Sequence, residues 1–328
     1  MEKKTKDLSN IGIYDECRLC PRQCGTNRSA KRTGTCGVTD ILRVARAALH
    51  FWEEPCISGT KGSGAVFFSG CNMHCVFCQN ENIAQGLVGK DISIERLAEI
   101  FLELQDKGAN NLNLVTASHY VPSVIKALDI AKHNGFCIPV IYNSSGYEKV
   151  DTLKALEGYV DVYLPDFKYM DEEISMNYSK AKDYALVAKE ALKEMVRQQP
   201  SCVFYPELFS YEESVKNGLL MDEEEEGFLI GKGVIVRQLL LPGHLEDAKA
   251  VTKYLYETYR NQIYISLMSQ YTPLKHHDRF MNLNRKVEKE EYEEWLDYVI
   301  KLGLEQGFVQ DLEVAMESFI PHFDGEGV

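Results

Sequence analysis

The sequence predicts an α/β fold, a partial (β/α)6 barrel preceded by a cysteine-rich module. Three observations predict this fold. Short apolar runs alternate with segments of helical periodicity from about residue 65 onward, which is typical of parallel βαβ units. The alternation contains six strands, and the residues available suit an open six-unit barrel better than a closed eight-unit one. Most of the cysteines precede or directly follow the first of these strands.

The six expected strands are short apolar runs separated by helical segments. They read AVFFS (65–69), NLNLVT (111–116), IPVIYN (138–143), YVDVYLP (159–165), GVIVRQLLL (233–241) and QIYISLM (262–268). Apolar residues at i, i+3, i+4 and i+7, counted from Ile94, predict the first helix. Ser93 is its expected N-cap, and Gly108 is expected to end it. Further helices are expected at about 121–134, 148–156 and 183–198, from residue 245, and around Trp295.

The composition excludes several classes of protein. The 328 residues include 36 basic and 49 acidic side chains, which gives a net charge of −13. A chain this acidic is a poor general binder of nucleic acid, so we expect no nucleic-acid partner. No run approaches the roughly 18 apolar residues of a transmembrane helix, and the first ten residues contain no apolar signal segment. We therefore expect a cytoplasmic protein without a membrane partner.

Three cysteines directly follow the first expected strand. Cys71, Cys75 and Cys78 lie in GCNMHCVFCQN with the spacing C-x3-C-x2-C, so their thiolates can converge on one iron–sulfur cluster. A [4Fe–4S] cluster usually has four cysteine ligands, and three leave one iron open to another ligand. The alternatives are a structural zinc loop or three buried thiols.

This triplet, with the aromatic Phe77 before its third cysteine, resembles the signature of the radical S-adenosylmethionine (SAM) superfamily. The resemblance implies that SAM binds the open iron through its amino and carboxylate groups. An electron from the cluster then cleaves the sulfonium and yields a 5′-deoxyadenosyl radical. The superfamily is built on an open (β/α)6 barrel, in agreement with the strand count.

Within the superfamily, the sequence is most similar to the pyruvate formate-lyase activating-enzyme-like group, above all in HFWEEPCISGTKGSGAVFFSGCNMHCVFCQN. In LPDFK, Asp166 and Lys168 resemble an Asp-x-Lys motif that lies against SAM in the activases. Asn143 in YNSSG stands where the activases have an aspartate, so a cation site there is in question. The alternative for Asp166 and Lys168 is a surface ion pair, which contributes only about 0–1 kcal/mol.

The glycine-rich segment that meets the SAM amino group in many relatives is missing. VTASH occupies its place, so Thr116, Ser118 or His119 is expected to contribute to SAM binding. His244 lies in LLLPGH, which resembles the activase segment at the end of the fifth strand. Either histidine could instead cap a helix or pack in the core.

Four further cysteines precede the barrel, and they predict a second metal site. Four thiolates suffice for a tetrahedral zinc site or for a second iron–sulfur cluster, and the spacing does not choose between them. These residues are Cys17, Cys20, Cys24 and Cys36. Cys56 is either an additional ligand or a half-buried thiol.

We expect three parts in the chain: a cysteine-rich module at 1–50, the barrel at 51–310 and a C-terminal tail at 311–328. The segment 201–232 is longer than a usual connection and acidic. We expect it to border the barrel mouth and help select a partner, the alternative being a solvated surface excursion.

The resulting hypothesis is a radical SAM enzyme that abstracts a hydrogen atom, in the activase-like case from a glycine of a partner protein. An electron donor such as flavodoxin or ferredoxin is implied as a second partner. One alternative is a radical SAM enzyme acting on a small molecule, peptide or RNA. The other is a non-catalytic metal-binding or electron-transfer protein, against which the open-iron triplet argues.

Overall fold

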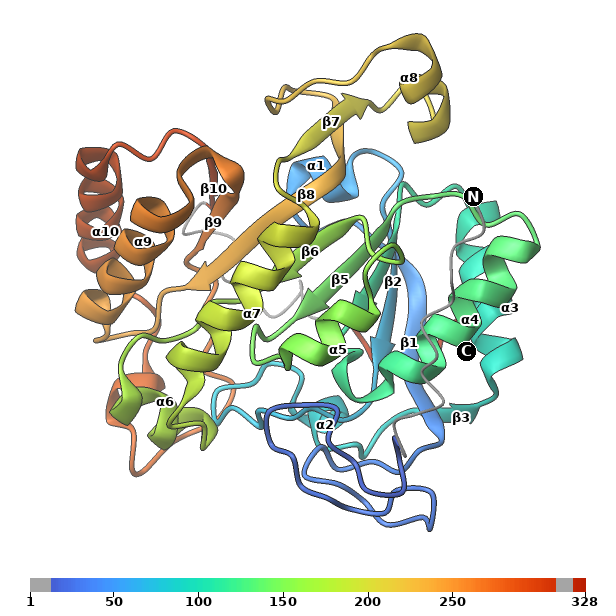
Figure 1. The fold of residues 1–328 in the computed structure, drawn as a ribbon. Coiled ribbons are helices and arrows are strands. Elements are labelled where there is room, and N and C mark those ends of the chain that lie inside the picture. Colours follow the sequence, from blue (N-terminus) through green and yellow to red (C-terminus); the bar gives the residue numbers. More distant parts are fainter. Residues whose placement is uncertain (1–12, 311–320) are drawn as a thin grey trace.

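The computed structural model describes residues 13–310 and 321–328, so the predicted tail lies partly outside the described residues. Within them, the sheet has the strand order β10-β9-β8-β6-β5-β4-β2-β1-β3, and β7 pairs with β8 (Figure 1). The strands are β1 (Leu42–His50), β2 (Ser63–Phe68), β3 (Lys90–Ile92), β4 (Leu112–Val115), β5 (Val140–Ser144), β6 (Val162–Pro165), β7 (Val203–Pro206), β8 (Phe228–Leu239), β9 (Tyr264–Met268) and β10 (Gly307–Val309). The helices are α1 (Pro55–Ser58), α2 (Glu81–Ala84), α3 (Ile94–Asp106), α4 (Val121–His133), α5 (Val150–Ala155), α6 (Glu172–Ser179), α7 (Tyr184–Gln198), α8 (Tyr211–Asn217), α9 (Leu245–Tyr259) and α10 (Lys289–Leu302).

The six predicted strands are confirmed as β2, β4, β5, β6, β8 and β9. Each pairs in parallel with the next, and a predicted helix follows each of them. The outer strands β10 and β3 lie at opposite ends of the hydrogen-bonded path, so the sheet does not close on itself. The predicted partial (β/α)6 barrel is therefore present.

Helix α3 shows how the local sequence sets these elements. The hydroxyl of Ser93 accepts a hydrogen bond from the Arg96 amide at 3.1 Å and so caps the first turn. Leu97 and Phe101, one turn apart, are fully buried against the sheet and α4. Gly108 follows the helix at φ +83°, a left-handed conformation that stops it. Among the described residues, no helix is long and apolar enough to cross a membrane.

Strand β1 is an element that the sequence did not predict. It runs antiparallel to β2 and contains a bulge between Val44 and Arg46, which breaks the period-two alternation that marks a strand. It lies inside the predicted module at 1–50, and its pairing makes residues 42–50 part of the sheet. The described end of the tail joins the same strand, because the Gly325 amide donates to the Ala45 carbonyl and the Ala47 amide donates to the Glu326 carbonyl.

The prediction that the segment 201–232 borders the barrel mouth is wrong. It forms β7, α8 and the first part of β8, and Figure 1 shows it at the end of the barrel opposite the arrowheads of the strands. The Glu207 carboxylate accepts a hydrogen bond from the Thr60 amide at 2.7 Å, just before β2 begins. The segment therefore borders the amino ends of the strands and not the barrel mouth, because β7 extends β8 backwards as an antiparallel hairpin.

Glu148 is a fully buried carboxyl group beside the barrel. Its oxygens accept hydrogen bonds from the Ser118 hydroxyl at 2.5 Å and from the Tyr142 hydroxyl at 3.2 Å. Burial raises the pKa of Glu148 to about 7, although both hydrogen bonds act against this shift. A glutamate in an unfolded chain has a pKa of about 4.3. The folded protein therefore holds this proton more tightly than the unfolded chain.

We predict that this group makes stability fall as the pH rises. Below about pH 4 the Glu148 carboxyl is protonated in both the folded and the unfolded state. Between about pH 4 and 7 it ionises in the unfolded chain alone, which lowers the free energy of the unfolded state. The loss by pH 8 is on the order of 3 kcal/mol. Glu148→Gln should remove this part of the pH dependence, measured as the difference in urea-unfolding free energy between pH 5 and pH 8. The same difference in wild type and variant would contradict the prediction.

Candidate active site

A cavity of about 550 Å³ lies inside the barrel, at the carboxyl ends of the parallel strands. Alternate residues of a strand point to the same side of the sheet, and Arg237 and Leu239 on β8 line the cavity in this way. Loops that follow β2, β4, β5 and β6 close its other sides. Of the predicted site residues, the cavity lining includes Cys71, Cys75, Cys78, Thr116, Asn143, Asp166 and Lys168. This is the end of an α/β barrel where enzymes place their chemistry.

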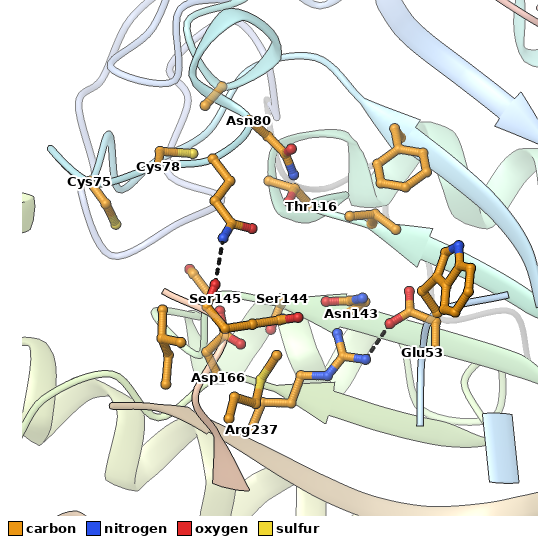
Figure 2. A pocket seen from close by; sticks show the side chains of 18 of the residues that line it. Glu53, Cys75, Cys78, Asn80, Thr116, Asn143, Ser144, Ser145, Asp166 and Arg237 are labelled. Carbon is orange, nitrogen blue, oxygen red and sulfur yellow. Dashed lines mark hydrogen bonds and ion pairs between the residues drawn. The ribbon is translucent and has the colours of Figure 1, made fainter. Parts of the chain in front are cut away.

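The cysteine triplet forms the loop between β2 and α2. Gly70 precedes it at φ +94°, and a β-carbon there would lie 2.8 Å from the Cys36 carbonyl oxygen, so no larger residue fits. The three cysteines are free thiols that face one cavity, and Figure 2 shows Cys75 and Cys78 side by side at one end of it. Burial, and then the neighbouring Cys75, raise the pKa of Cys71 to about 11 and that of Cys78 to about 12.

Such a set of converging, mutually repelling thiols fits a bound metal cluster, whose positive charge stabilises the thiolates. Within the described residues, no three cysteine, histidine or acidic side chains lie close enough to hold one metal ion. A four-iron cluster holds its cysteine sulfurs farther apart than a single ion does. The three cysteines line one cavity, as residues that hold one cluster would.

Asp166 and Lys168 meet in the wall of the same cavity, directly after β6. The Lys168 ammonium lies 2.5 Å from the Asp166 carboxylate, and both side chains are mostly buried. Burial lowers the pKa of Lys168, but the charge of Asp166 outweighs it, so the pKa is raised and the ammonium stays charged. Gly146 packs directly on this segment, because a β-carbon on it would lie only 2.1 Å from the Asp166 carbonyl oxygen. The pair is therefore a built part of the cavity wall, which disagrees with the surface alternative.

Thr116 and Asn143 lie side by side on the neighbouring strand ends β4 and β5 (Figure 2). Thr116 has φ +59°, a conformation that costs a β-branched residue energy, and its amide donates to the Asn143 carbonyl at 2.9 Å. Backbone strain of this kind is concentrated at ligand sites. Both residues are therefore placed to contact a ligand in the cavity.

The structure does not bring His119 or His244 to the cavity. His119 is buried, its Nε2 lies 2.8 Å from the Ser69 carbonyl, and burial lowers its pKa to about 3. The Nε2 of His244 lies 2.7 Å from the Tyr178 hydroxyl, before helix α9. Both histidines therefore match the packing and helix-end alternative that the sequence left open.

A buried charge group at the floor of the cavity was missed from the sequence. The Arg237 guanidinium binds the carboxylates of Glu53 and Glu54, and the contact of Arg237 Nε with Glu54 Oε1 is 2.8 Å (Figure 2). The Asn113 amide donates to Glu53 at 2.9 Å. Burial acts to raise the pKa of Glu54, but the charge of Arg237 outweighs it, so the pKa lies below the usual range. An arginine within the apolar run GVIVRQLLL was the signal that could have indicated this group.

Cys56, the possible extra ligand, is fully buried in α1 and packs against Cys202 and Ile235. It is not among the residues that line the cavity of the triplet. This placement corresponds to the alternative of a buried thiol.

Comparison with known proteins agrees with this site. Residues 65–206 match the family model of the radical SAM superfamily, and this range holds the triplet and the Asp166–Lys168 pair. Residues 65–206 therefore form a radical SAM domain. Membership implies a [4Fe–4S] cluster and SAM, whose chemistry when bound is the formation of the 5′-deoxyadenosyl radical. We propose that Cys71, Cys75 and Cys78, which line the cavity, would hold that cluster.

Several proteins are similar to this radical SAM chain. An uncharacterized protein of Methanocaldococcus jannaschii, MJ0674, is 29% identical over 303 residues, which cover 89% of this chain and 77% of that protein. A radical SAM methyltransferase from Sphaerobacter thermophilus matches with a TM-score of 0.48 and 11% identity over 77% of this chain and 68% of its own. A domain of a pyruvate-formate lyase-activating enzyme from Bacteroides vulgatus matches with a TM-score of 0.34 and 14% identity over 58% and 92%.

We predict that Asp166→Ala and Lys168→Ala each weaken SAM binding and leave the cluster intact. Loss of a charge-assisted hydrogen bond costs about 1.5–3 kcal/mol, or roughly 10- to 150-fold in affinity. The measurement is the SAM dissociation constant of the reconstituted variants, with the iron content checked in parallel. Lys182→Ala is the matched control, because Lys182 is exposed and its ion-pair partner among the described residues is the exposed Glu172. Unchanged affinity in both variants would remove the pair from the SAM site.

Proposed function

We propose that this radical SAM enzyme abstracts a hydrogen atom from a glycine backbone of a partner protein. The observation that carries the proposal is the position of Asp166 and Lys168. They match the activase-like motif in the sequence, and they line the same cavity as the cysteine triplet. That two residues of the activase-like motif share a cavity with the triplet supports the proposal.

The floor of the cavity supports a peptide as substrate. Glu53, Glu54 and Arg237 together carry one net negative charge, which disfavours an anionic substrate. The Nε and Nη2 atoms of Arg237 donate to the two carboxylates, and within the described residues Nη1 has no hydrogen-bond partner. Its N–H groups can donate to a neutral carbonyl oxygen, such as that of a peptide bond. Glu53, Glu54 and Arg237 thereby orient the substrate. SAM binds at the end of the cavity that carries the cysteine triplet.

The experiment uses glycine labelled with deuterium at its α-carbon. The enzyme, reconstituted anaerobically, receives SAM, dithionite and an extract of cells grown on this glycine, separated into macromolecules and small molecules. The expected result is deuterium in 5′-deoxyadenosine with the macromolecular fraction, together with a protein-based radical signal in electron paramagnetic resonance.

Two outcomes would contradict the proposal. Deuterium or turnover with the small-molecule fraction alone would favour the small-molecule alternative. Absence of 5′-deoxyadenosine from SAM and dithionite alone, in protein with an intact cluster, would contradict the enzyme assignment itself.

A further inference from the structure

The Cys75 sulfur has a hydrogen-bond donor that comes from outside the loop of the triplet. The hydroxyl of Ser179, the last residue of α6, donates to this sulfur at 3.0 Å. The hydroxyl of Tyr169 lies 2.7 Å from that of Ser179. Both Ser179 and Tyr169 are fully buried. The two hydroxyls and the sulfur therefore form one buried chain of hydrogen bonds.

The chemistry of the three groups fixes the direction of these hydrogen bonds. A serine hydroxyl has one hydrogen to donate and two lone pairs with which to accept. A cysteine that binds iron is a thiolate without a hydrogen, so Cys75 in that state can only accept. The single hydrogen of Ser179 then points to the sulfur, and the Tyr169 hydroxyl donates to Ser179. Both O–H groups therefore donate in the direction of Cys75.

The end of α6 is held against the triplet loop by backbone contacts. The Val76 amide donates to the Tyr178 carbonyl at 2.8 Å, so the residues next to Cys75 and Ser179 are themselves joined. Arg22 donates to the Ser179 carbonyl and to the Asn72 carbonyl, each at 2.8 Å. Arg22 belongs to the N-terminal cysteine-rich segment, which holds the buried Cys17, Cys20 and Cys36 and the exposed Cys24. These contacts hold the Ser179 hydroxyl in place beside the sulfur.

Neither Ser179 nor Tyr169 lines the cavity. Among the described residues that do so, Cys75 is included and these two are not. The Tyr169 ring packs edge-on against Phe77 of the triplet loop, with 6.4 Å between the ring centroids. Both residues therefore lie behind the cysteine, where they can act on it without touching a ligand in the cavity.

A hydrogen bond to a cysteine ligand changes the reduction potential of an iron–sulfur cluster. Reduction adds one electron, which increases the negative charge on the sulfurs. An O–H group that donates to a sulfur therefore stabilises the reduced state more than the oxidised state. The site is buried, so water does not screen this effect, and the second hydroxyl polarises the first.

We propose that Ser179, oriented by Tyr169, is a positioning residue that raises the reduction potential of the SAM-binding cluster through its hydrogen bond to Cys75. One electron enters the cluster from the reductant, and both hydroxyls keep their hydrogens, so no proton is transferred. Weaker one-electron donors can then reduce the cluster. The inference rests on the proposal that Cys75 holds the cluster, and not on the identity of the hydrogen donor.

The test measures the reduction potential of the cluster in anaerobically reconstituted protein, without SAM or substrate. Electron paramagnetic resonance measures the reduced cluster in samples poised with dithionite at a series of potentials. In Ser179→Ala, the ratio of reduced to oxidised cluster at a fixed potential should fall about tenfold, which is a shift of about 59 mV to more negative values. Tyr169→Phe should give a smaller shift in the same direction, because Ser179 keeps its hydroxyl.

The matched control is Ser175→Ala. Ser175 is also buried in α6, but its hydroxyl donates to the Glu172 carbonyl of the same helix at 3.1 Å. This variant should keep the wild-type potential. A wild-type potential in Ser179→Ala, or an equal shift in Ser175→Ala, overturns the proposal. If Ser179→Ala does not keep its iron, Tyr169→Phe takes its place, and an unchanged potential there overturns the proposal in the same way.

A third variant separates this inference from the assignment of the cluster ligand. The signal that is followed should be absent from Cys75→Ala. A signal that persists in Cys75→Ala would contradict the ligand assignment, and the hydrogen-bond proposal with it. A signal that is lost there but keeps its potential in Ser179→Ala overturns the hydrogen-bond proposal alone.

Discussion

Replacing any one of Cys71, Cys75 and Cys78 with alanine should abolish SAM cleavage. Each thiolate holds one iron, and all three sulfurs face the cavity that also holds the Asp166–Lys168 pair. The measurement is 5′-deoxyadenosine formed with SAM and dithionite after anaerobic reconstitution, and we expect a fall to the background of the assay. The part of the roughly 400 nm absorbance that belongs to this cluster should vanish with it.

The matched control is Cys137→Ala. Cys137 is an exposed thiol that follows α4, outside the lining of the cavity. It should keep full activity, since an exposed lone thiol ligates nothing here. A single triplet variant that still produces 5′-deoxyadenosine at the wild-type rate would refute the ligand assignment.

Arg237→Met should destabilise the protein by about 3–5 kcal/mol, because it leaves two buried carboxylates without their cation. Without Arg237, burial raises the pKa of Glu54 above its usual value in place of the present lowering. The variant should therefore lose stability as the pH rises, since a raised carboxyl pKa favours the folded state only while it is protonated. Urea unfolding followed by circular dichroism measures both effects.

Two comparisons separate this prediction from a general loss of packing. Adding Glu54→Gln to Arg237→Met removes one unpaired charge and should restore part of the stability. Arg18→Met breaks an ion pair with Glu16 in which both side chains are more than half exposed, and should change stability by less than about 1 kcal/mol. A loss in Arg237→Met no larger than in Arg18→Met would contradict the buried network.

The six parallel strands were predictable because each is a short apolar run that a helical segment separates from the next. The triplet was predictable because all its ligands lie within eight residues of one loop. Strand β1 was not, because its bulge removes the alternation on which such a prediction depends. Local sequence patterns therefore predicted which segments are helices and which are strands. The prediction failed where a local irregularity broke the pattern.

The remainder of the site depends on contacts between distant segments. Arg237 meets Glu53 and Glu54 across more than 180 residues, so its place in an apolar run indicates a buried charge but not which carboxylates pair with it. His119 shows the converse, since its place in the sequence beside Thr116 indicated a ligand contact. The short 3₁₀ helix after β4, Ser118–Tyr120, turns it into the interior.

The pairing of residues 325 and 326 with β1 also bears on how the protein is made. The Ala47–Glu326 hydrogen bond joins positions 279 residues apart, and β3 pairs only with the first three residues of β1, from Leu42 to Val44. On the ribosome, the rest of that edge therefore stays unpaired until the far segment has been synthesised. An unpaired strand edge is a template for association with other chains. Nascent chains should thus be most prone to aggregate before residues 325 and 326 have been synthesised.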